Sequence, residues 1–237
     1  MIVDDFEILN HEIQIIEPGF VYLSIKRFGG DTSRTIVAEL QKVETNNDTS
    51  IKGIIIDLRN NPGGNVIDGI ELVDAFLSVG HISTLSYRNP KNNQRHEAVA
   101  KSSDLLDAKL AVLINEDSAS AAELVAGALQ FHKRATIIGS PSFGKGSVQK
   151  LYTSDTEALK LTVGDFTAGD RSVSVENPIH PDIIVTLPTI DPKTELQHLI
   201  QQSSLSQSEK DSMLIPLSQL PNRPVKQSVP WHENFAE

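Results

Sequence analysis

Two apolar runs, each followed by a turn of small residues and then by a helical pattern, restrict the fold more than any other feature. Residues 53–58 read GIIIDL, and residues 110–114 read LAVLI. Uninterrupted branched residues of this kind are typical of strands that are covered on both faces. Apolar residues then recur at helical spacing in 66–78 and in 121–131. Strands that alternate with helices predict an α/β fold with parallel strands, whose ligands bind beyond the carboxyl ends of the strands.

The same cycle continues on both sides of these runs. Residues 20–26 alternate apolar and polar side chains like a half-buried strand, and residues 31–44 place apolar side chains along one helical stripe. Residues 135–139 predict a further strand, whereas the polar stretch 88–103 predicts a loop or a short lid. We expect short strands toward the C-terminal end of the core, at 147–152, 159–163, 172–175 and 182–185.

Length and composition fit one core rather than two. The chain has 237 residues, of which 39% are hydrophobic, and this is enough for one full-sized core. Residues 1–19 are expected to form an N-terminal strand or the remnant of a preceding domain, and residues 20–188 the core. Residues 189–237 are rich in glutamine, serine and proline, which predicts one short helix near 194–202 and an extended or mobile tail.

Charge and residue types exclude several classes of function. The formal net charge is -10, so the phosphate neutralisation that gives most nucleic-acid affinity is weak, and nucleic acid is excluded as a partner. The chain has no cysteine, which removes disulfides, thiolate catalysis and zinc-thiolate sites. Its seven histidines show no metal-ligand spacing, so we expect neither a metal nor a cofactor.

The apolar runs also bear on membranes and export. No run approaches the roughly 20 residues that a membrane-spanning helix needs, and we expect no integral membrane segment. The N-terminus MIVDDFEILN has acidic residues where a signal peptide has lysines and arginines. We therefore expect no signal peptide in this chain.

A serine turn, NEDSASAAE at 115–123, follows the second apolar run. Ser120 and Glu123 have the spacing of a capping box, which starts a helix and satisfies two of its amides. Alternatively, the Ser120 hydroxyl and the Ala121 amide face a site at the positive end of the helix dipole. The two interpretations are compatible in part, because Ser118 can supply the cap instead.

A glycine turn, NNPGG at 60–64, follows the first apolar run. It fits a plain strand-to-helix turn in which glycine adopts a positive φ and Asn65 caps the helix. Alternatively, glycine lets the bare backbone approach a ligand. In that case an amide of Gly64 or Gly63 joins that of Ala121 in an oxyanion hole with two donors.

A lysine turn, SFGKGSVQ at 142–149, follows the strand predicted at 135–139. Lysines in loops are usually solvated. The stretch 139–145 matches most of a phosphate-binding loop, but Gly146 stands where that loop needs serine or threonine, and the next residues alternate like a strand, which excludes nucleotide binding. On a strand, Lys145 and Gln149 share a face, and the glutamine amide oxygen can orient the amine. A buried lysine that is kept neutral can act as the base for a serine nucleophile.

These segments together resemble the carboxyl-terminal processing serine peptidases, also called tail-specific proteases. The resemblance extends from about Phe20 to Val185 through an ordered series of stretches: GFVYLSIKRF, GIIIDLRNNPGG, LAVLINEDSASAAELVAGALQFHKRATIIGSPSFGKGSVQ, LKLTVGDF and NPIHPDIIV. It implies an α/β core of repeated β-turn-α units, related to the crotonase and Clp protease folds. It also implies a location in the cell envelope or periplasm.

The resemblance assigns a role to each candidate residue. It implies that Ser120 is the nucleophile, that Lys145 is the general base and that Gln149 orients the lysine. It places the oxyanion donors at Ala121 and Gly64. The implied activity is that of a serine endopeptidase that cleaves unfolded or C-terminal regions of polypeptides without metal or cofactor.

Two features of the sequence leave alternatives open. Members of this family usually carry a PDZ domain of roughly 80 to 100 residues that captures the substrate's tail, but about 19 residues precede Phe20 here. The chain is therefore either a member without that domain or a catalytic fragment. The alternative functions are a non-catalytic or latent scaffold, which a substrate-delivering or activating partner would complete, and an acyl-thioester enzyme that has no Ser/Lys dyad. The presence of Ser120, Lys145 and Gln149 favours the peptidase.

Overall fold

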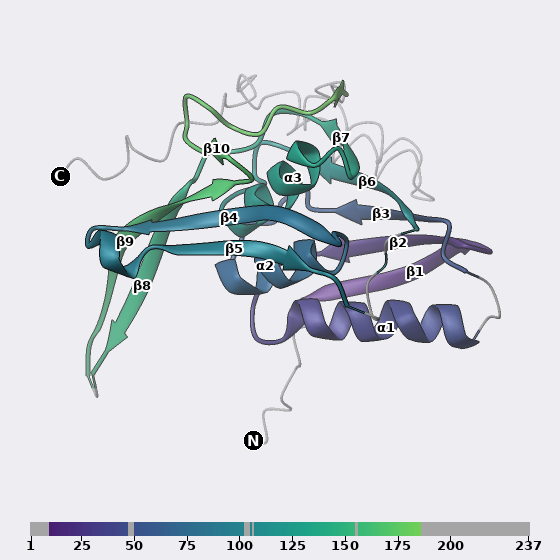
Figure 1. Cartoon of the computed structure of the whole chain (residues 1–237), viewed down its shortest axis with the longest axis horizontal. Helices are drawn as coiled ribbons and strands as arrows, with labels where there is room; N and C mark the ends of the chain where they lie inside the picture. Colours follow the sequence, from purple (N-terminus) through teal and green to yellow (C-terminus); the bar gives the residue numbers. More distant parts are fainter. Residues whose placement is uncertain (1–9, 47–49, 102–104, 106, 155, 186–237) are drawn as a thin grey trace, which may run out of the picture. The chain divides into compact units, whose positions relative to one another are not determined.

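The computed structural model describes residues 10–46, 50–101, 105, 107–154 and 156–185. Within them the chain forms two β-sheets and three α-helices (Figure 1). The predicted α/β class is confirmed. The helix expected near 194–202 and the rest of the predicted tail lie outside the described residues.

The first sheet contains the strands that the apolar runs predict. Its order is β1-β2-β3-β6-β7-β11, and all neighbours are parallel except the antiparallel pair β1 and β2. Ile54 in β3 pairs with Leu110 in β6, so both predicted runs lie at the centre of the sheet. The strands are β1 (His11–Glu17), β2 (Phe20–Ile25), β3 (Gly53–Asp57), β6 (Lys109–Ile114), β7 (Ala135–Gly139) and β11 (Ile183–Ile184).

The second sheet corrects two predictions. Residues 88–103, expected to be a loop or lid, contain the 3-10 turn η1 (Pro90–Asn92) and β5 (Gln94–Val99). Five of the six side chains of β5 are not buried, so a sheet-edge strand carries a polar sequence. The expected short strand 159–163 belongs to an 11-residue strand, because this strand pairs with both β8 and β4. The other strands of this sheet are β4 (Val79–Tyr87), β8 (Ser147–Thr153), β9 (Ala158–Ala168) and β10 (Arg171–Ser172).

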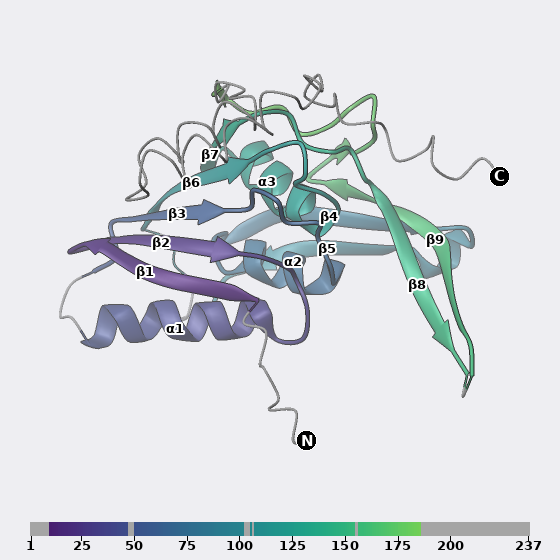
Figure 2. The ribbon, with the colours of Figure 1, turned by 180° about the vertical axis from the view of Figure 1, so that it is seen from behind.

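The helices follow the predicted turns. They are α1 (Thr32–Asn46), α2 (Val66–Asp74) and α3 (Ala121–Phe131). Asn65 caps α2 as predicted, since its side chain accepts from Ile67 and Asp68, but α2 ends four residues before the predicted end. Helix α3 contacts β7 of the first sheet and β4 and β9 of the second, and it lies between the two sheets (Figure 2).

The position of α3 explains its composition. Every residue from Ala121 to Leu129 is buried, which accounts for an apolar sequence with no polar face. At Gly127, a Cβ atom would lie 2.7 Å from Ala168 Cβ and 2.7 Å from the Cδ1 atom of Ile179. The N-terminal end of a rigidly packed helix therefore places Ser120. None of the helices in the described part of the chain is long and apolar enough to cross a membrane.

Candidate active site

Ser120 lies in a strained turn directly before α3. Its φ of 57° and ψ of -118° are rare for a residue other than glycine, and only 7% of it is exposed. Strained backbone of this kind concentrates at functional sites, where the surrounding structure must hold it. Ser118 fixes the turn: its hydroxyl donates to the Leu58 carbonyl at 2.8 Å and accepts from the Asn115 amide at 2.9 Å. Ser118 therefore stabilises the turn rather than capping the helix.

Glu123 joins the serine turn to the lysine turn. This carboxylate is fully buried, and its Oε2 atom accepts from the Ser120 amide at 2.8 Å and from the Lys145 amide at 2.7 Å. Its Oε1 atom accepts from the Gly144 amide and from the Ser142 hydroxyl, both at 2.6 Å. The backbones of the two candidate catalytic residues are thus bound to one oxygen atom of Glu123, which precedes Lys145 by 22 residues along the chain.

The sequence interpretation gave Glu123 a role in a capping box alone. Its bond to the Ser120 amide forms that half of the box as predicted. The three bonds to residues 142–145 were missed. The signal was present, because Glu123 is an acidic residue inside an otherwise apolar helix, AAELVAGAL, and a buried carboxylate must find donors.

Lys145 lies in the loop before β8 and is partly buried. Burial lowers the pKa of its ammonium group, the charge of Lys160 lowers this pKa further, and Glu123 opposes both effects. The net pKa lies below the ordinary lysine value. A larger fraction of Lys145 is therefore neutral near neutral pH, which is the state that a general base requires.

The glycine turn packs directly against the serine turn. The φ angles of Gly63 and Gly64 are 92° and 139°. A Cβ atom at Gly63 would lie 2.7 Å from Ser120 Cβ, and one at Gly64 would lie 1.8 Å from the Phe28 carbonyl oxygen. Both interpretations of the glycines therefore apply, because these positions need a positive φ and also a close approach of bare backbone.

The hydrogen bonds of this turn distinguish the two candidate donors. The side-chain oxygen of Asn61, which is fully buried, accepts a hydrogen bond from the Gly63 amide at 2.8 Å. No described residue accepts a hydrogen bond from the amides of Gly64 or Ala121. Gly64 rather than Gly63 is thus the free donor beside Ser120.

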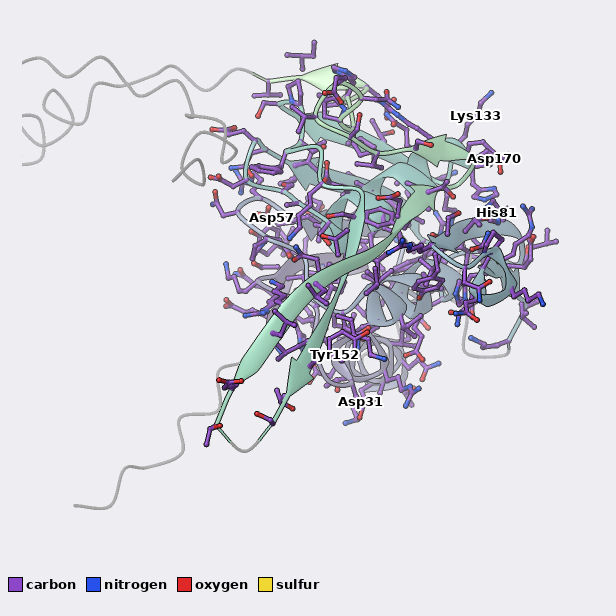
Figure 3. The ribbon with its side chains drawn as sticks, turned by 90° about the vertical axis from the view of Figure 1, so that its left-hand side faces the viewer. Asp31, Asp57, His81, Lys133, Tyr152 and Asp170 are labelled. Atoms are coloured by element: carbon purple, nitrogen blue, oxygen red, sulfur yellow. The ribbon has the colours of Figure 1, made fainter. Side chains whose placement is uncertain are left out.

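An ion pair fixes the start of the glycine turn at the carboxyl end of β3. The Nε and Nη2 atoms of Arg59 donate to the two carboxylate oxygens of Asp57, and the shortest of these contacts is 2.6 Å. The Tyr22 hydroxyl also donates to Asp57, at 2.6 Å. Burial by itself would raise the pKa of Asp57, but the bonds from Arg59 and Tyr22 outweigh it and leave this pKa below its usual value. Asp57 lies well apart from His81 in the molecule (Figure 3).

We expect Asp57→Asn to lower the free energy of unfolding by about 2 kcal/mol at neutral pH, because an amide cannot accept both charged bonds. The folded pKa of Asp57 is lowered, so its ionised form stabilises the protein above about pH 4, and this contribution is lost as the pH falls further. The deficit of the variant should therefore shrink in acid. Urea unfolding at neutral pH and below about pH 4 measures the free energy of unfolding of the wild type and of Asp57→Asn. A difference between the two proteins that is the same at both pH values would contradict this role of Asp57.

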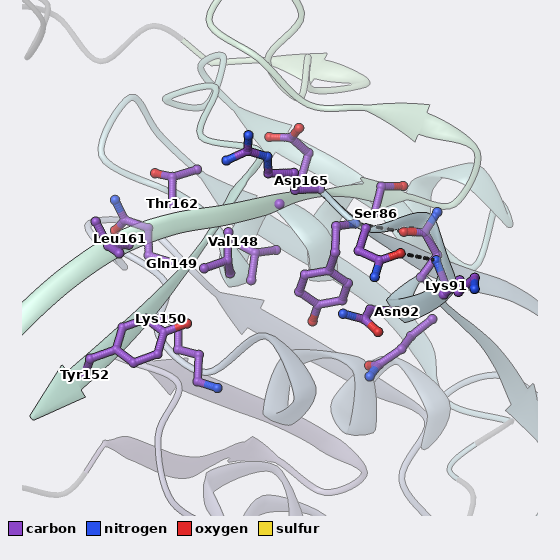
Figure 4. Close-up of a pocket in the computed structure, with 17 residues that line it drawn as sticks. Ser86, Lys91, Asn92, Val148, Gln149, Lys150, Tyr152, Leu161, Thr162 and Asp165 are labelled. Carbon is purple, nitrogen blue, oxygen red and sulfur yellow. Dashed lines mark hydrogen bonds between the residues drawn. The ribbon is translucent and has the colours of Figure 1, made fainter.

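Gln149 is in β8, and its side chain is exposed. It lines a groove beside the β8–β9 hairpin (Figure 4). In the described part of the chain no hydrogen bond joins Gln149 to Lys145. The structure therefore brings Ser120, Ala121, Gly64 and Lys145 together through their backbones, and it places Gln149 four residues beyond the lysine.

Comparison with known proteins identifies the family of this chain. The model of peptidase family S41 matches residues 19–185. The carboxy-terminal-processing protease of Bartonella bacilliformis is 42% identical over 176 residues, which cover 73% of this chain and 40% of that protein. The carboxyl-terminal-processing protease of Synechocystis is 32% identical, with 71% and 38% covered. The chain thus spans no more than 40% of the length of these two relatives.

Solved structures share the fold. The photosystem II D1 C-terminal processing protease superimposes with a TM-score of 0.58 at 25% identity, over 75% of this chain and 45% of that chain. A putative S41 protease from Bacteroides fragilis superimposes with a TM-score of 0.59 at 18% identity, over 87% and 57%. The family match covers both sheets except β1, together with α3 and all three turns of the site, and the chain belongs to peptidase family S41.

Proposed function

We propose that this chain is the catalytic core of a serine endopeptidase that cleaves unfolded or C-terminal regions of polypeptides through Ser120 and Lys145. One observation carries the proposal: Glu123 binds the amides of both residues with a single oxygen atom. A strained serine at a helix start and a partly buried lysine with a lowered pKa are thereby held next to each other.

The arrangement supports acyl transfer. Neutral Lys145 takes the proton from the Ser120 hydroxyl as the serine oxygen attacks the peptide carbonyl carbon. The amides of Ala121 and Gly64, which have no acceptor among the described residues, donate to the oxyanion. The ammonium of Lys145 then protonates the leaving amine. Water, deprotonated by the same lysine, hydrolyses the acyl ester and releases Ser120.

Gln149 keeps its proposed role as the residue that orients Lys145. The shared strand face expected from the sequence does not apply, because Lys145 lies in the loop before β8 and a register shift separates Val148 from Gln149 within β8. The support for this role is the family resemblance, together with the four-residue spacing of the two side chains. Because the glutamine would position rather than react, its contribution is smaller than that of the dyad.

The resemblance adds proposals that concern the whole protein. These are a core of residues 20–188 with the repeated β-turn-α unit of crotonase and Clp protease folds, and a location in the cell envelope or periplasm. Polypeptides are the substrates, and a delivering or activating partner remains part of the alternative in which the site is latent.

Digestion of casein, an unfolded protein, tests the function. We expect the wild-type chain to cleave casein and Ser120→Ala to lose at least about 1,000-fold in rate, because the nucleophile is gone. Mass spectrometry of the products gives the cleavage preference, and circular dichroism confirms that the variant is folded. Equal cleavage by both proteins would refute the assignment of Ser120. No cleavage by either would favour the latent scaffold.

A further inference from the structure

A groove lies between the β8–β9 hairpin and the turn that joins β4 to β5. Its volume is about 1270 Å³. Residues 148–150, 152 and 161–165 line it from the hairpin, and residues 86–89 and 91–94 line it from the turn (Figure 4). Gln149 belongs to this lining, so the groove adjoins the candidate active site.

The groove is basic in a chain that is acidic as a whole. Arg88 and Lys91 on the turn and Lys150 on β8 contribute three cations, and Asp165 is the one carboxylate among the lining residues. The three cations are exposed, and none of them forms an ion pair with a described residue. The Lys150 ammonium lies 5.2 Å from the centre of the Tyr152 ring. These groups favour carboxylates close to an aromatic surface.

The groove also borders an unpaired strand edge. Residues 158–165 of β9 pair with β8 on one side, while on the other side β4 pairs only with residues 164–166. The edge of residues 158–163 that faces away from β8 therefore has no strand partner among the described residues. Unpaired amides and carbonyls in a row can receive an extended peptide as an added strand.

We propose that this groove binds an extended, acidic segment of the polypeptide substrate. The proposal rests on the proposed peptidase function and names the substrate class of that site. Gln149 follows Lys145 by four residues, so at most about 14 Å of chain separates the groove from the base. An acidic stretch that begins within about four residues of the scissile bond would enter the groove at Gln149.

Binding is tested apart from catalysis, with the Ser120→Ala protein. The probe is a fluorescent peptide of about twelve residues in which glutamates alternate with valine and serine, and its counterpart carries lysine in place of each glutamate. We expect anisotropy titration to show that the acidic peptide binds at least about tenfold more tightly than its lysine counterpart. The ratio of the two affinities should fall as the salt concentration increases. Equal affinities for the two peptides would overturn the proposal.

Charge reversal locates the binding site. The groove variant combines Arg88→Glu, Lys91→Glu and Lys150→Glu. Its matched control combines Lys42→Glu, Lys52→Glu and Lys109→Glu. These three lysines are also exposed but lie outside the groove, and their reversal changes the net charge by the same amount. We expect the groove variant to bind the acidic peptide about tenfold more weakly and the control within about twofold of the parent. If both variants lost affinity for the acidic peptide equally, net charge alone would explain the binding, and the proposal would be overturned.

Two further measurements separate the remaining outcomes. A single-stranded oligonucleotide of the same charge should compete poorly, whereas competition equal to that of the peptide would identify a general polyanion surface and contradict the proposal. In the active protein, the groove variant should lose about tenfold in kcat/KM for a substrate with an acidic flank and keep its kcat/KM for a neutral one. If no substrate is cleaved but the binding pattern holds, the proposed peptidase function fails, while the proposal that this basic groove binds acidic segments stands.

Discussion

Lys145→Ala is expected to lower kcat by about 10² to 10⁴, because the reaction loses its general base. Lys145→Arg should lower kcat to a similar degree, since a guanidinium stays protonated in proteins and cannot act as the base. The fold should survive both changes, because Glu123 is bound by the backbone amide at this position rather than by the side chain. Steady-state cleavage of a quenched fluorescent peptide measures the effect.

Lys109→Ala is the control for this experiment, since Lys109 is an exposed lysine on β6. It should retain wild-type turnover, and all three variants should unfold at temperatures close to that of the wild type. Turnover by Lys145→Ala within about tenfold of the wild type would show that another group activates Ser120.

Glu123→Gln should have the second largest effect on activity and should also lower stability. The Glu123 side chain is not proposed to react. The carboxylate accepts from four donors, and a glutamine amide presents its NH₂ group to two of them. Unsatisfied buried donors cost about 1–3 kcal/mol each, so we expect about 2–4 kcal/mol of lost stability. A shift of about 1 Å between Ser120 and Lys145 lowers kcat by about 100-fold.

Glu116→Gln provides the matched comparison. Glu116 is in the same turn, but it is exposed, and among the described residues it accepts only from the Ser140 hydroxyl. We expect its stability to change by less than about 0.5 kcal/mol. The assay is carried out at a temperature at which Glu123→Gln is folded, so that a fall in kcat with little change in KM reports misplacement rather than unfolding. Unchanged kcat in folded Glu123→Gln would contradict the positioning role.

The sequence predicts the parts of the site that local patterns encode. Buried runs such as 53–58 show where the central strands lie, because strands covered on both faces are continuously apolar. Glycine and serine turns at their carboxyl ends then indicate where the backbone must bend or approach closely. The positions of Ser120, Gly64 and Lys145 at one edge of the first sheet follow from this reasoning.

The parts that were missed depend on contacts between distant segments. A capping box already accounts for Glu123 at the start of α3, and no local pattern shows that residues 142–145 supply its other donors. Strand β5 was missed because a sheet-edge strand can be almost entirely polar. The full length of β9 is set by β8 and β4, which pair with different parts of it.

The pH dependence of kcat/KM tests the central claim most directly, namely that neutral Lys145 activates Ser120. Burial and the charge of Lys160 lower the pKa of Lys145, so kcat/KM of the wild type should rise through an apparent pKa below the ordinary lysine value of about 10.4. Lys160→Gln should move this rise to higher pH, because it removes the positive charge that lowers the pKa of Lys145. A rise at the ordinary lysine value, or a profile that Lys160→Gln leaves unchanged, would contradict the account.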